Sequence, residues 1–241
     1  TGGTSSVEVQ WIRDDNETGF PCDLLGISAL CKKRNPTKQL VQTLAGIKSE
    51  NTYGKKRRPI NQNKLFDCLP RAVPTGLYFY SDPALAFSVG CDLGAITHSH
   101  PTAYLATGCL SSIIAFICKG STIERAVLDT MKMLKEHDGF EECFAALDKA
   151  LALLDETTSP LTDVAELGNG STADSALAIG VYCACVHYDY LSAVQLAANQ
   201  DGISDICAFI AGALKGALLG YAEIPSGFVK KLQFADTVKA V

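Results

Sequence analysis

The feature that most constrains the fold of this chain is a succession of helical segments with few strand signals among them. From Leu65 onward, apolar residues recur at helical spacing in one segment after another, and short loops join the segments. Many segments are apolar on nearly every face, as in PTAYLATGCLSSIIAFICKG, and such helices occupy the centre of large bundles. The sequence therefore predicts an all-α fold, a compact multi-helix bundle, in a single domain that spans residues 1–241.

Turn and capping residues predict where several of these helices begin. Asp82 and Pro83 start the segment DPALAFSVGCDLGAIT, and Ser121 with Glu124 three residues later has the pattern of a capping box. Two shorter helices are predicted earlier, in CDLLGISALCKK and TKQLVQTLAGIKS, and a long polar loop follows over residues 49–64. The first third of the chain is thus the part with the weakest pattern.

The last apolar segment, ICAFIAGALKGALLGYA, is only just long enough to cross a membrane, and Lys215 lies in its middle. Gly212, Gly216 and Gly220 fall four residues apart and therefore share one face of the helix. Because that face carries no side chains, a neighbouring helix can approach it closely. The sequence favours a tightly packed central helix, and no membrane partner is expected.

The charge balance and the cysteines narrow the classes of partner and compartment. The net charge of −5 at pH 7 argues against nucleic acid as a partner. A basic run at residues 55–58 lies beside Gly54 and Pro59 and is interpreted as a solvated loop, with contact to an anion as the alternative. The 10 cysteines form no CxxC pairs and lie mostly in apolar runs. We interpret them as buried free thiols and expect an intracellular, cytoplasmic protein.

The polar stretch before the last apolar helix is a candidate site. Asn199, Asp201, Ser204 and Asp205 lie close together there, around a glycine. Carboxylates and small oxygen ligands on such a loop suit Mg²⁺. The alternative is a helix cap, in which Ser204 or Asp205 accepts hydrogen bonds from free backbone N–H groups and the helix dipole favours the carboxylate.

The motif AITHSHPTAY carries two histidines, His98 and His100, in front of another helix. Two histidines at this spacing suggest a zinc site, although no third ligand is evident. Contact with a ligand at the mouth of a pocket is a second interpretation, and a purely structural helix start is a third.

The motif AELGNGSTADSALAIG places a flexible turn before a helix. Gly168, Asn169 and Gly170 form the turn, and Ser171 with Thr172 leads the helix. Backbone N–H groups at such a turn can bind phosphate or ribose oxygens. A plain loop in front of a capped helix is the alternative.

These signals occur in one order along the chain. The segments LPRAVPTGLY, ITHSHPTAY, LGNGSTADSALAIGVYCAC and AANQDGISDICAFIAGALKGALLGYAEIPSGF together resemble the ADP-ribosylglycohydrolase family. The resemblance covers residues 60–230 and leaves residues 1–59 unassigned. It implies an all-α fold with a cleft for ADP-ribose or an ADP-ribosylated protein, and two Mg²⁺ ions at the ribose end. The implied reaction is hydrolysis of the glycosidic bond at the ribose C1 carbon, where an oxocarbenium-like charge develops.

The resemblance also implies roles for individual residues of this chain. By position, His98 contacts ADP-ribose and Asp205 is a metal ligand. The residues expected to line the cleft are Gly168, Asn169, Gly170 and Ser171.

The acidic segment departs from the Asp-x-Asp-Thr pattern of the family. The corresponding residues are Ile203, Ser204, Asp205 and Ile206, and isoleucine offers no oxygen to a metal. Asp201, two residues earlier, is the candidate substitute ligand. The Thr-Asp-Asp segment that the family carries near its N-terminus is not found, because the acids of RDDNETG lack flanking helices. Two functions remain: an ADP-ribosyl hydrolase with a degenerate metal site, or a catalytically inactive relative that binds ADP-ribose or serves as a structural protein, as crystallin-like relatives do.

Overall fold

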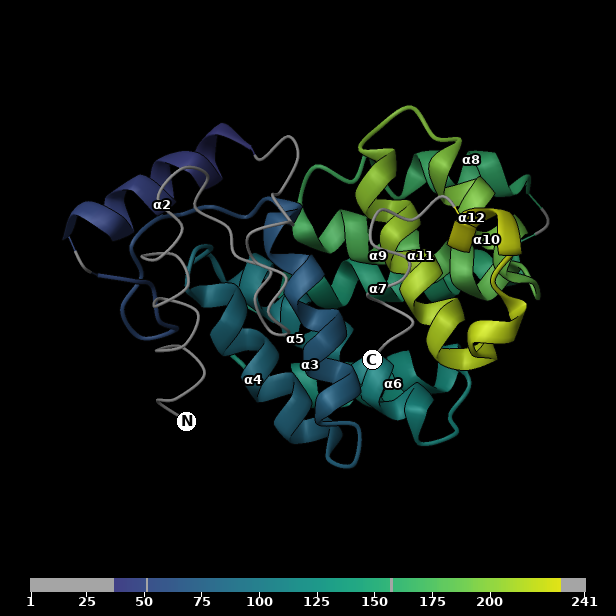
Figure 1. Cartoon of the computed structure of the whole chain (residues 1–241), viewed down its shortest axis with the longest axis horizontal. Coiled ribbons are helices and arrows are strands. Elements are labelled where there is room, and N and C mark those ends of the chain that lie inside the picture. Colours follow the sequence, from purple (N-terminus) through teal and green to yellow (C-terminus); the bar gives the residue numbers. More distant parts are fainter. Residues whose placement is uncertain (1–36, 51, 157, 231–241) are drawn as a thin grey trace.

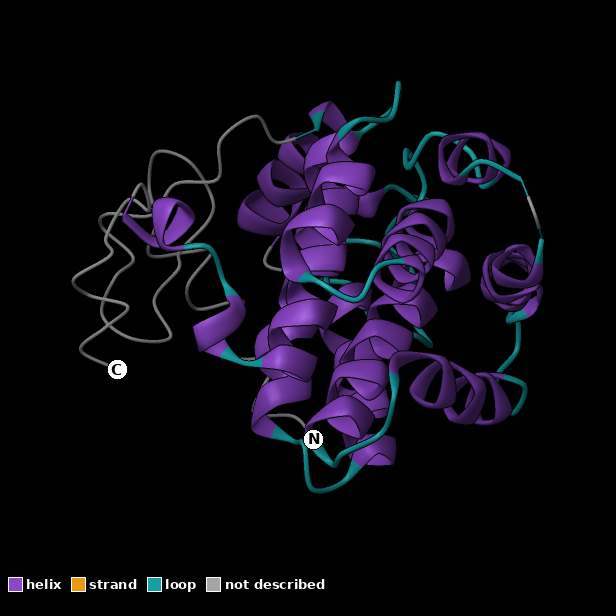
Figure 2. Cartoon of the chain, turned by 90° about the vertical axis from the view of Figure 1, so that its right-hand side faces the viewer, coloured by secondary structure: helices purple, strands orange, loops and turns teal. Residues whose placement is uncertain are grey.

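The computed structural model describes residues 37–50, 52–156 and 158–230, where the chain folds into helices joined by loops (Figure 1). No strand forms in these ranges, as Figure 2 shows. Isolated antiparallel bridges join Lys55 to Arg58 and Leu65 to Thr172. The all-α prediction is confirmed, and the helix predicted in CDLLGISALCKK lies outside the described residues.

The helices follow one another at short intervals. In chain order the α-helices are α2 (Lys38–Glu50), α3 (Ala72–Tyr78), α4 (Pro83–Ala95), α5 (Pro101–Cys118), α6 (Ile123–Leu134), α7 (Glu141–Ala152), α8 (Pro160–Glu166), α9 (Ala173–Val186), α10 (Tyr190–Ala198), α11 (Ser204–Leu219) and α12 (Ser226–Lys230). The 3-10 turns among the described residues are η2 (Phe66–Arg71), η3 (Leu153–Asp155) and η4 (Tyr221–Glu223). Sequence periodicity did not indicate α3, α8 or α12 because helices of 5 to 7 residues are too short to repeat it.

The central helix of the bundle is α5, of whose 18 residues only the N- and C-terminal ends and two aromatic positions escape full burial. It packs against α3, α4, α6, α9 and α11. The approach of α4 to α5 is close because glycines lie at the contact. A Cβ on Gly90 would lie 2.4 Å from the Ser111 hydroxyl, and one on Gly108 would lie 2.3 Å from the Cys91 sulfur. The segment that was apolar on every face is therefore the core helix that its pattern predicted.

Two apolar helices, α5 and α11, are the segments to consider for membrane crossing, and both pack against other helices of the bundle. One described helix, α5, is long and apolar enough to cross a membrane by length and composition, but 78% of that stretch is buried within the protein. In α11, the other candidate, Lys215 is 4% exposed and donates a hydrogen bond to the Tyr188 carbonyl over 3.3 Å. Burial lowers the pKa of this lysine. Other helices of the same chain cover both segments.

The glycines of α11 match the prediction of close packing only in part. A Cβ on Gly212 would lie 3.0 Å from the Tyr190 hydroxyl of α10. In contrast, no heavy atom of a neighbouring described element lies within 4 Å of a Cβ on Gly216 or Gly220. Gly220 ends the helix instead, with a φ of 81° that favours glycine. The stripe of glycines therefore serves one close contact and one helix end.

The start of α6 corrects a predicted cap. The N-cap is Thr122, whose hydroxyl accepts a hydrogen bond from the Arg125 N–H over 3.2 Å, and not Ser121. Ser121 instead completes the end of α5, where its N–H donates to the Phe116 carbonyl after Gly120 with a φ of 94°. The tight turn between the helices leaves Thr122 as the extended residue next to the first turn of α6.

Candidate functional site

The polar loops indicated by the sequence lie at the N-terminal ends of three helices. We call residues 96–100, before α5, the histidine loop; residues 168–171, before α9, the glycine-rich loop; and residues 199–205, which lead into α11, the acidic loop. The Ile203 N–H donates to the Asn169 carbonyl over 2.7 Å, so the acidic loop rests on the glycine-rich loop. Gly202 permits this approach, because a Cβ there would lie 2.1 Å from the same oxygen.

The glycine-rich loop is held in a conformation that its sequence dictates. Gly168 and Gly170 have φ values of 110° and 72°, a region that favours glycine. The Asn169 side-chain oxygen accepts a hydrogen bond from the Ser171 N–H over 3.0 Å, and the Ser175 hydroxyl accepts one from the Gly170 N–H over 3.1 Å. The turn predicted from the sequence is confirmed, and its conformation is set by local hydrogen bonds.

Residues 60–65, which we call the linking segment, connect the histidine loop to the glycine-rich loop. The Asn61 amide nitrogen donates to the Thr97 carbonyl over 2.9 Å, and its oxygen accepts from the Ser99 N–H over 3.1 Å. At the other end of the segment, the Lys64 carbonyl accepts from the Ala173 N–H over 3.0 Å. The structure therefore places all three loops at one end of the bundle. By the family resemblance, residues 61–68 (NQNKLFDC) correspond to a phosphate loop that is rich in glycine in the family and lacks glycine here.

The two histidines of the histidine loop differ in environment. His98 is fully buried, and its Nδ1 lies 2.8 Å from the Thr97 hydroxyl. His100 is the N-cap of α5, where its Nδ1 accepts a hydrogen bond from the Thr102 N–H over 3.2 Å. His100 therefore supports the helix-start interpretation of this motif. Contact between His98 and a ligand stays a prediction.

The acidic loop does not form the helix cap that was one interpretation of its sequence. In the described part of the chain, no side chain caps α11, and its N-cap residue is Ile203. Asp201 and Asp205 are both exposed, while Ile206 is buried in the core. Asp205 stays in the first turn of the helix, where the helix dipole favours a carboxylate.

The family resemblance implied two Mg²⁺ ions beside this loop, and the described residues do not fit them. Among residues 37–50, 52–156 and 158–230, no group of three or more His, Cys, Asp or Glu side chains could hold a metal ion. Mg²⁺ requires near-octahedral oxygen ligands, and the isoleucines at positions 203 and 206 supply none. Asp201 and Asp205 as metal ligands stay predictions that would need further ligands from other parts of the chain.

A cavity of about 480 Å³ lies between α2 and the linking segment. Leu40, Leu44 and Ile47 of α2 pack with Ile96, which fixes the helix beside the histidine loop. The side of α2 next to this apolar face, which shares Ile47 with it, contributes residues at helical spacing to the cavity. The lining of the cavity includes Gln39, Gln42, Gly46, Asn61, Gln62 and Asn63. Most of these residues carry neutral carboxamide side chains.

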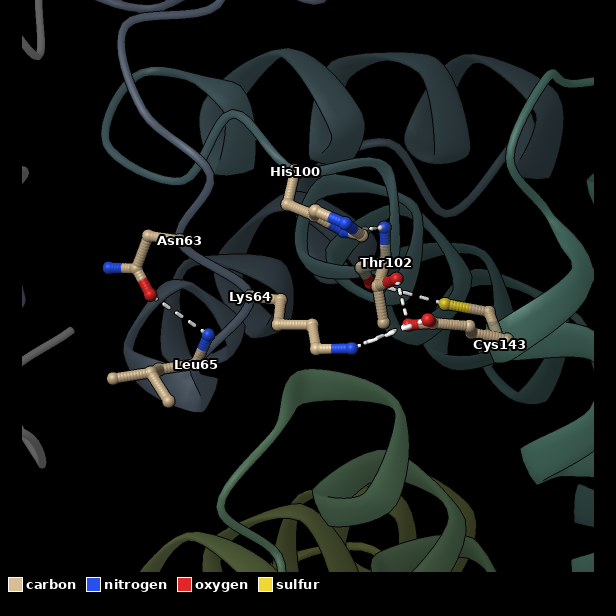
Figure 3. A network of polar contacts seen from close by, with 7 residues as sticks. Asn63, Lys64, Leu65, His100, Thr102 and Cys143 are labelled. Atoms are coloured by element: carbon tan, nitrogen blue, oxygen red, sulfur yellow. Dashed lines mark hydrogen bonds and ion pairs between the residues drawn. The ribbon is translucent and has the colours of Figure 1, made fainter.

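Asn63 lines this cavity and carries a buried hydrogen-bond donor. Its side-chain oxygen accepts from the Leu65 N–H over 3.0 Å, which fixes the orientation of the amide because a donor must face an oxygen. The amide nitrogen is buried and has no hydrogen-bond partner among the described residues. Figure 3 shows this nitrogen on the side of Asn63 away from Leu65. A buried donor without a partner is costly, so an acceptor from a ligand would be stabilised here.

Lys64, next to Asn63, is held by a polar network from α5 and α7 (Figure 3). Its ammonium group lies 3.2 and 3.3 Å from the Glu142 carboxylate oxygens, and the Thr102 hydroxyl donates to the same carboxylate over 2.5 Å. The hydrogen bond from Thr102 and the ion pair with Lys64 lower the pKa of Glu142. The network therefore ties the linking segment to the starts of two helices.

A second cavity, of about 300 Å³, lies near the C-terminal end of α9 and is lined by residues of η3, α8 and α9. Asp163 is buried there and accepts hydrogen bonds from the Tyr182 hydroxyl over 2.5 Å and from the Thr158 hydroxyl. Burial and this carboxylate raise the pKa of Tyr182. The polar loops lie at the opposite, N-terminal end of α9, so we assign the candidate site to the first cavity.

Sequence reasoning missed the part of the site that α2 provides. One signal was present in the predicted helix TKQLVQTLAGIKS: Gln39, Gln42, Gly46 and Glu50 recur three or four residues apart and share one face. A polar stripe of this kind is common on solvated helices, so the sequence alone did not distinguish it. The partner of Lys64, Glu142, is 78 residues away and had no local signal.

The fold and the site define one class of protein. It is an all-helical bundle whose polar loops meet at one end, beside an amide-lined cavity. A model of the ADP-ribosylglycohydrolase family matches residues 8–241, and the chain therefore belongs to this family. A solved structure described as an ADP-ribosylglycohydrolase-related protein complex is similar, with a TM-score of 0.68 at 20% sequence identity. That match covers 85% of this chain and 66% of the other, and at such identity it shows the fold alone. Comparison with curated proteins gave no match.

Proposed function

We propose that this chain binds ADP-ribose, free or attached to a protein, in the cavity beside α2 and along the three loops next to it. The observation that carries the proposal is the convergence of the histidine loop and the glycine-rich loop on one linking segment, beside a cavity with an unsatisfied donor. Family membership supports this choice of ligand, because members act on ADP-ribosylated substrates. Family membership alone does not decide whether this chain hydrolyses the glycosidic bond, and that depends on its own residues.

The lining of the cavity suits the nucleoside part of such a ligand. Its volume of about 480 Å³ falls within the usual range of small-molecule pockets. Carboxamide side chains such as Gln39, Gln42 and Gln62 offer a donor and an acceptor together, which matches the edge of a purine base. The buried amide nitrogen of Asn63 adds a donor in a fixed position. Ile60, which is half-buried, supplies apolar surface against which a ring can pack.

The residues of the acidic loop favour binding over hydrolysis by two metal ions. Cleavage of the glycosidic bond needs stabilisation of positive charge on the ribose and activation of a water molecule. The described residues bring Asp201 and Asp205 to the loop, both exposed, with isoleucine at the neighbouring positions 203 and 206. We therefore propose recognition of ADP-ribose that does not depend on Mg²⁺. Hydrolysis is the alternative, and it would take its remaining metal ligands from outside the described residues.

A substitution in α2 tests whether the cavity is the binding site. Gly46 lines the cavity, and among the described residues no heavy atom of a neighbouring element lies within 4 Å of a Cβ placed there. Gly46→Leu should therefore fill the cavity and weaken ADP-ribose binding by more than roughly tenfold, an effect of the order of one lost ligand contact. Gly46→Ala is the matched control and should keep the affinity while raising stability by about 0.5 to 1 kcal/mol.

The hydrolysis alternative needs a separate assay. Peptides that carry ADP-ribose on serine or on arginine would be incubated with the chain and Mg²⁺, and released ADP-ribose measured by chromatography. The proposal predicts binding of these peptides without release. Release that depends on Mg²⁺ and is lost in Asp205→Asn would show that the chain is a metal-dependent hydrolase.

A further inference from the structure

A basic hairpin stands beside the cavity and has no role in the site described so far. It consists of Lys55, Lys56, Arg57 and Arg58, all of which are exposed. Lys55 and Arg58 form an antiparallel bridge, with N–O distances of 3.1 and 2.9 Å in the two directions. In Figure 1 this part of the chain is the dark blue loop that follows α2 at the left of the molecule. The four cations are therefore held in a defined turn.

Both ends of the basic hairpin are fastened to the turn between α4 and α5. The Gly54 N–H donates to the Ile96 carbonyl over 3.0 Å, and a Cβ on Gly54 would lie 2.1 Å from the Ala95 oxygen. On the other side, the Ile60 N–H donates to the Ser99 hydroxyl over 3.1 Å. Thus the hairpin cannot swing away from the histidine loop without breaking these contacts.

The charges of the basic hairpin are not balanced within the described part of the chain. Lys56 pairs with Asp92 over 3.0 Å, and the Lys55 ammonium lies 5.2 Å from the centre of the Tyr53 ring. Neither Arg57 nor Arg58 has a carboxylate within ion-pair distance among the described residues. Lys55 and Arg58 also face each other across the bridge, and like charges in that arrangement destabilise it. A bound anion would offset this repulsion.

We propose that the basic hairpin binds the phosphate groups of a ligand whose nucleoside occupies the cavity beside α2. Thr52 and Ile60, which flank the hairpin, both line that cavity, so one ligand can reach from the cavity to the guanidinium groups. Arginine suits this role because its planar donors match phosphate oxygens in pairs. This inference rests on the proposed function for the ligand, while the anion site itself is tested independently. The phosphates come either from the pyrophosphate of a single ADP-ribose or from a further ADP-ribose unit attached to it.

The test compares Arg57→Gln/Arg58→Gln with a control of the same charge change, Arg125→Gln/Lys132→Gln. The control residues are exposed on α6, where both pair with Asp129. Binding of adenosine, ADP-ribose, an ADP-ribose dimer and inorganic pyrophosphate would be measured by calorimetry at low salt. We expect the hairpin variant to bind ADP-ribose about tenfold more weakly, the order of one charge-assisted contact, and adenosine unchanged. The control variant should match the wild type throughout.

Each outcome decides the proposal. Weaker binding of ADP-ribose and of the dimer places the pyrophosphate of the first unit on the hairpin, whereas weaker binding of the dimer alone places the second unit there. Unchanged affinity of the hairpin variant for both ligands overturns the proposal. If the wild type binds no ADP-ribose, the proposed function fails, and pyrophosphate then decides: binding to the wild type and not to the hairpin variant keeps the anion site, and absence of binding to the wild type removes it.

Discussion

The glycine-rich loop and the acidic loop touch each other, yet they differ in what holds them. In the glycine-rich loop, the φ values of Gly168 and Gly170 and the hydrogen bonds of Asn169 and Ser175 fix the backbone. In the acidic loop, the backbone contact from Ile203 to Asn169 is present, but the carboxylates are exposed. The backbone of the glycine-rich loop is thus held in place, while the described carboxylates do not come together in a metal site.

This difference is the one that the proposed function requires, because binding without catalysis needs an intact loop backbone and no complete metal site. Backbone geometry is set by glycines and local hydrogen bonds, and those are intact at the start of α9. Metal binding needs several oxygen ligands in one place, and the isoleucines at positions 203 and 206 supply none, although the helix that follows is formed. Variants in the two loops should therefore differ in their effects, with the largest effect in the glycine-rich loop.

The largest effect is expected from Gly170→Ala. Gly170 has a φ of 72°, and a Cβ there would lie 2.7 Å from the Cys207 sulfur, so the variant combines backbone strain with a clash against a buried side chain. We expect the free energy of unfolding to fall by about 2 to 4 kcal/mol, measured by urea denaturation. Gly216→Ala in α11 is the control, because it meets no such contact in the described residues, and it should not lower stability. Equal stability of the two variants would contradict this account of the loop.

The next effect concerns the donor in the cavity. Asn63→Asp keeps the oxygen that accepts from the Leu65 N–H and replaces the buried amide nitrogen with an acceptor. ADP-ribose affinity should fall about tenfold or more, because a donor to the ligand is lost and a charge is added. Calorimetry measures the affinity, and thermal unfolding checks that the fold is kept. Unchanged affinity would place the ligand away from Asn63.

A smaller effect is expected from Glu142→Gln, and it should depend on pH. The Thr102 hydrogen bond and the Lys64 ion pair lower the pKa of Glu142, so the ionised form contributes stability above the unfolded pKa of about 4.3. The side chain is 49% exposed, which limits the contribution to below about 1 kcal/mol. The difference in unfolding free energy between wild type and variant should be constant above about pH 5 and shrink as the pH falls below about 4. A difference that grows as the pH falls would contradict the prediction that ionised Glu142 stabilises the folded state.

The smallest effect is expected in the acidic loop. Asp201→Asn/Asp205→Asn removes both carboxylates, which are exposed and cap no helix by a side-chain hydrogen bond in the described residues. ADP-ribose affinity with Mg²⁺ present should stay within about twofold of the wild type, since exposed charges contribute little. Calorimetry in the same buffer provides the comparison. A large loss of affinity would instead restore the acidic loop to the binding site as a metal or ligand contact.

The sequence predicted the helical fold and the turn of the glycine-rich loop because both follow from local patterns. The apolar pattern of α5 indicated a core helix, and the glycines at positions 168 and 170 indicated a turn. The cavity could not be predicted in the same way. It depends on the docking of α2 through Leu40 and Ile47 against Ile96, a contact between segments that no local pattern relates.

The roles of single residues were the hardest to predict. The N-cap of α6 is Thr122 because the Ser121 N–H bonds to the Phe116 carbonyl at the end of α5. The geometry of the turn between the two helices decides this, and no local pattern predicts it. The interpretation of the acidic loop as a helix cap was wrong for a similar reason, since Ile203 takes the N-cap position and its N–H is bound to the neighbouring loop.

The most direct test of the central claim is calorimetric titration of the wild-type chain with ADP-ribose, once with Mg²⁺ and once with EDTA. The account predicts binding in both buffers, with dissociation constants that agree within about twofold, because the linking segment, the glycine-rich loop and Asn63 supply the contacts. Absence of binding in both buffers would favour the structural, crystallin-like alternative. Binding that requires Mg²⁺ would contradict the account and show that the acidic loop still holds a metal.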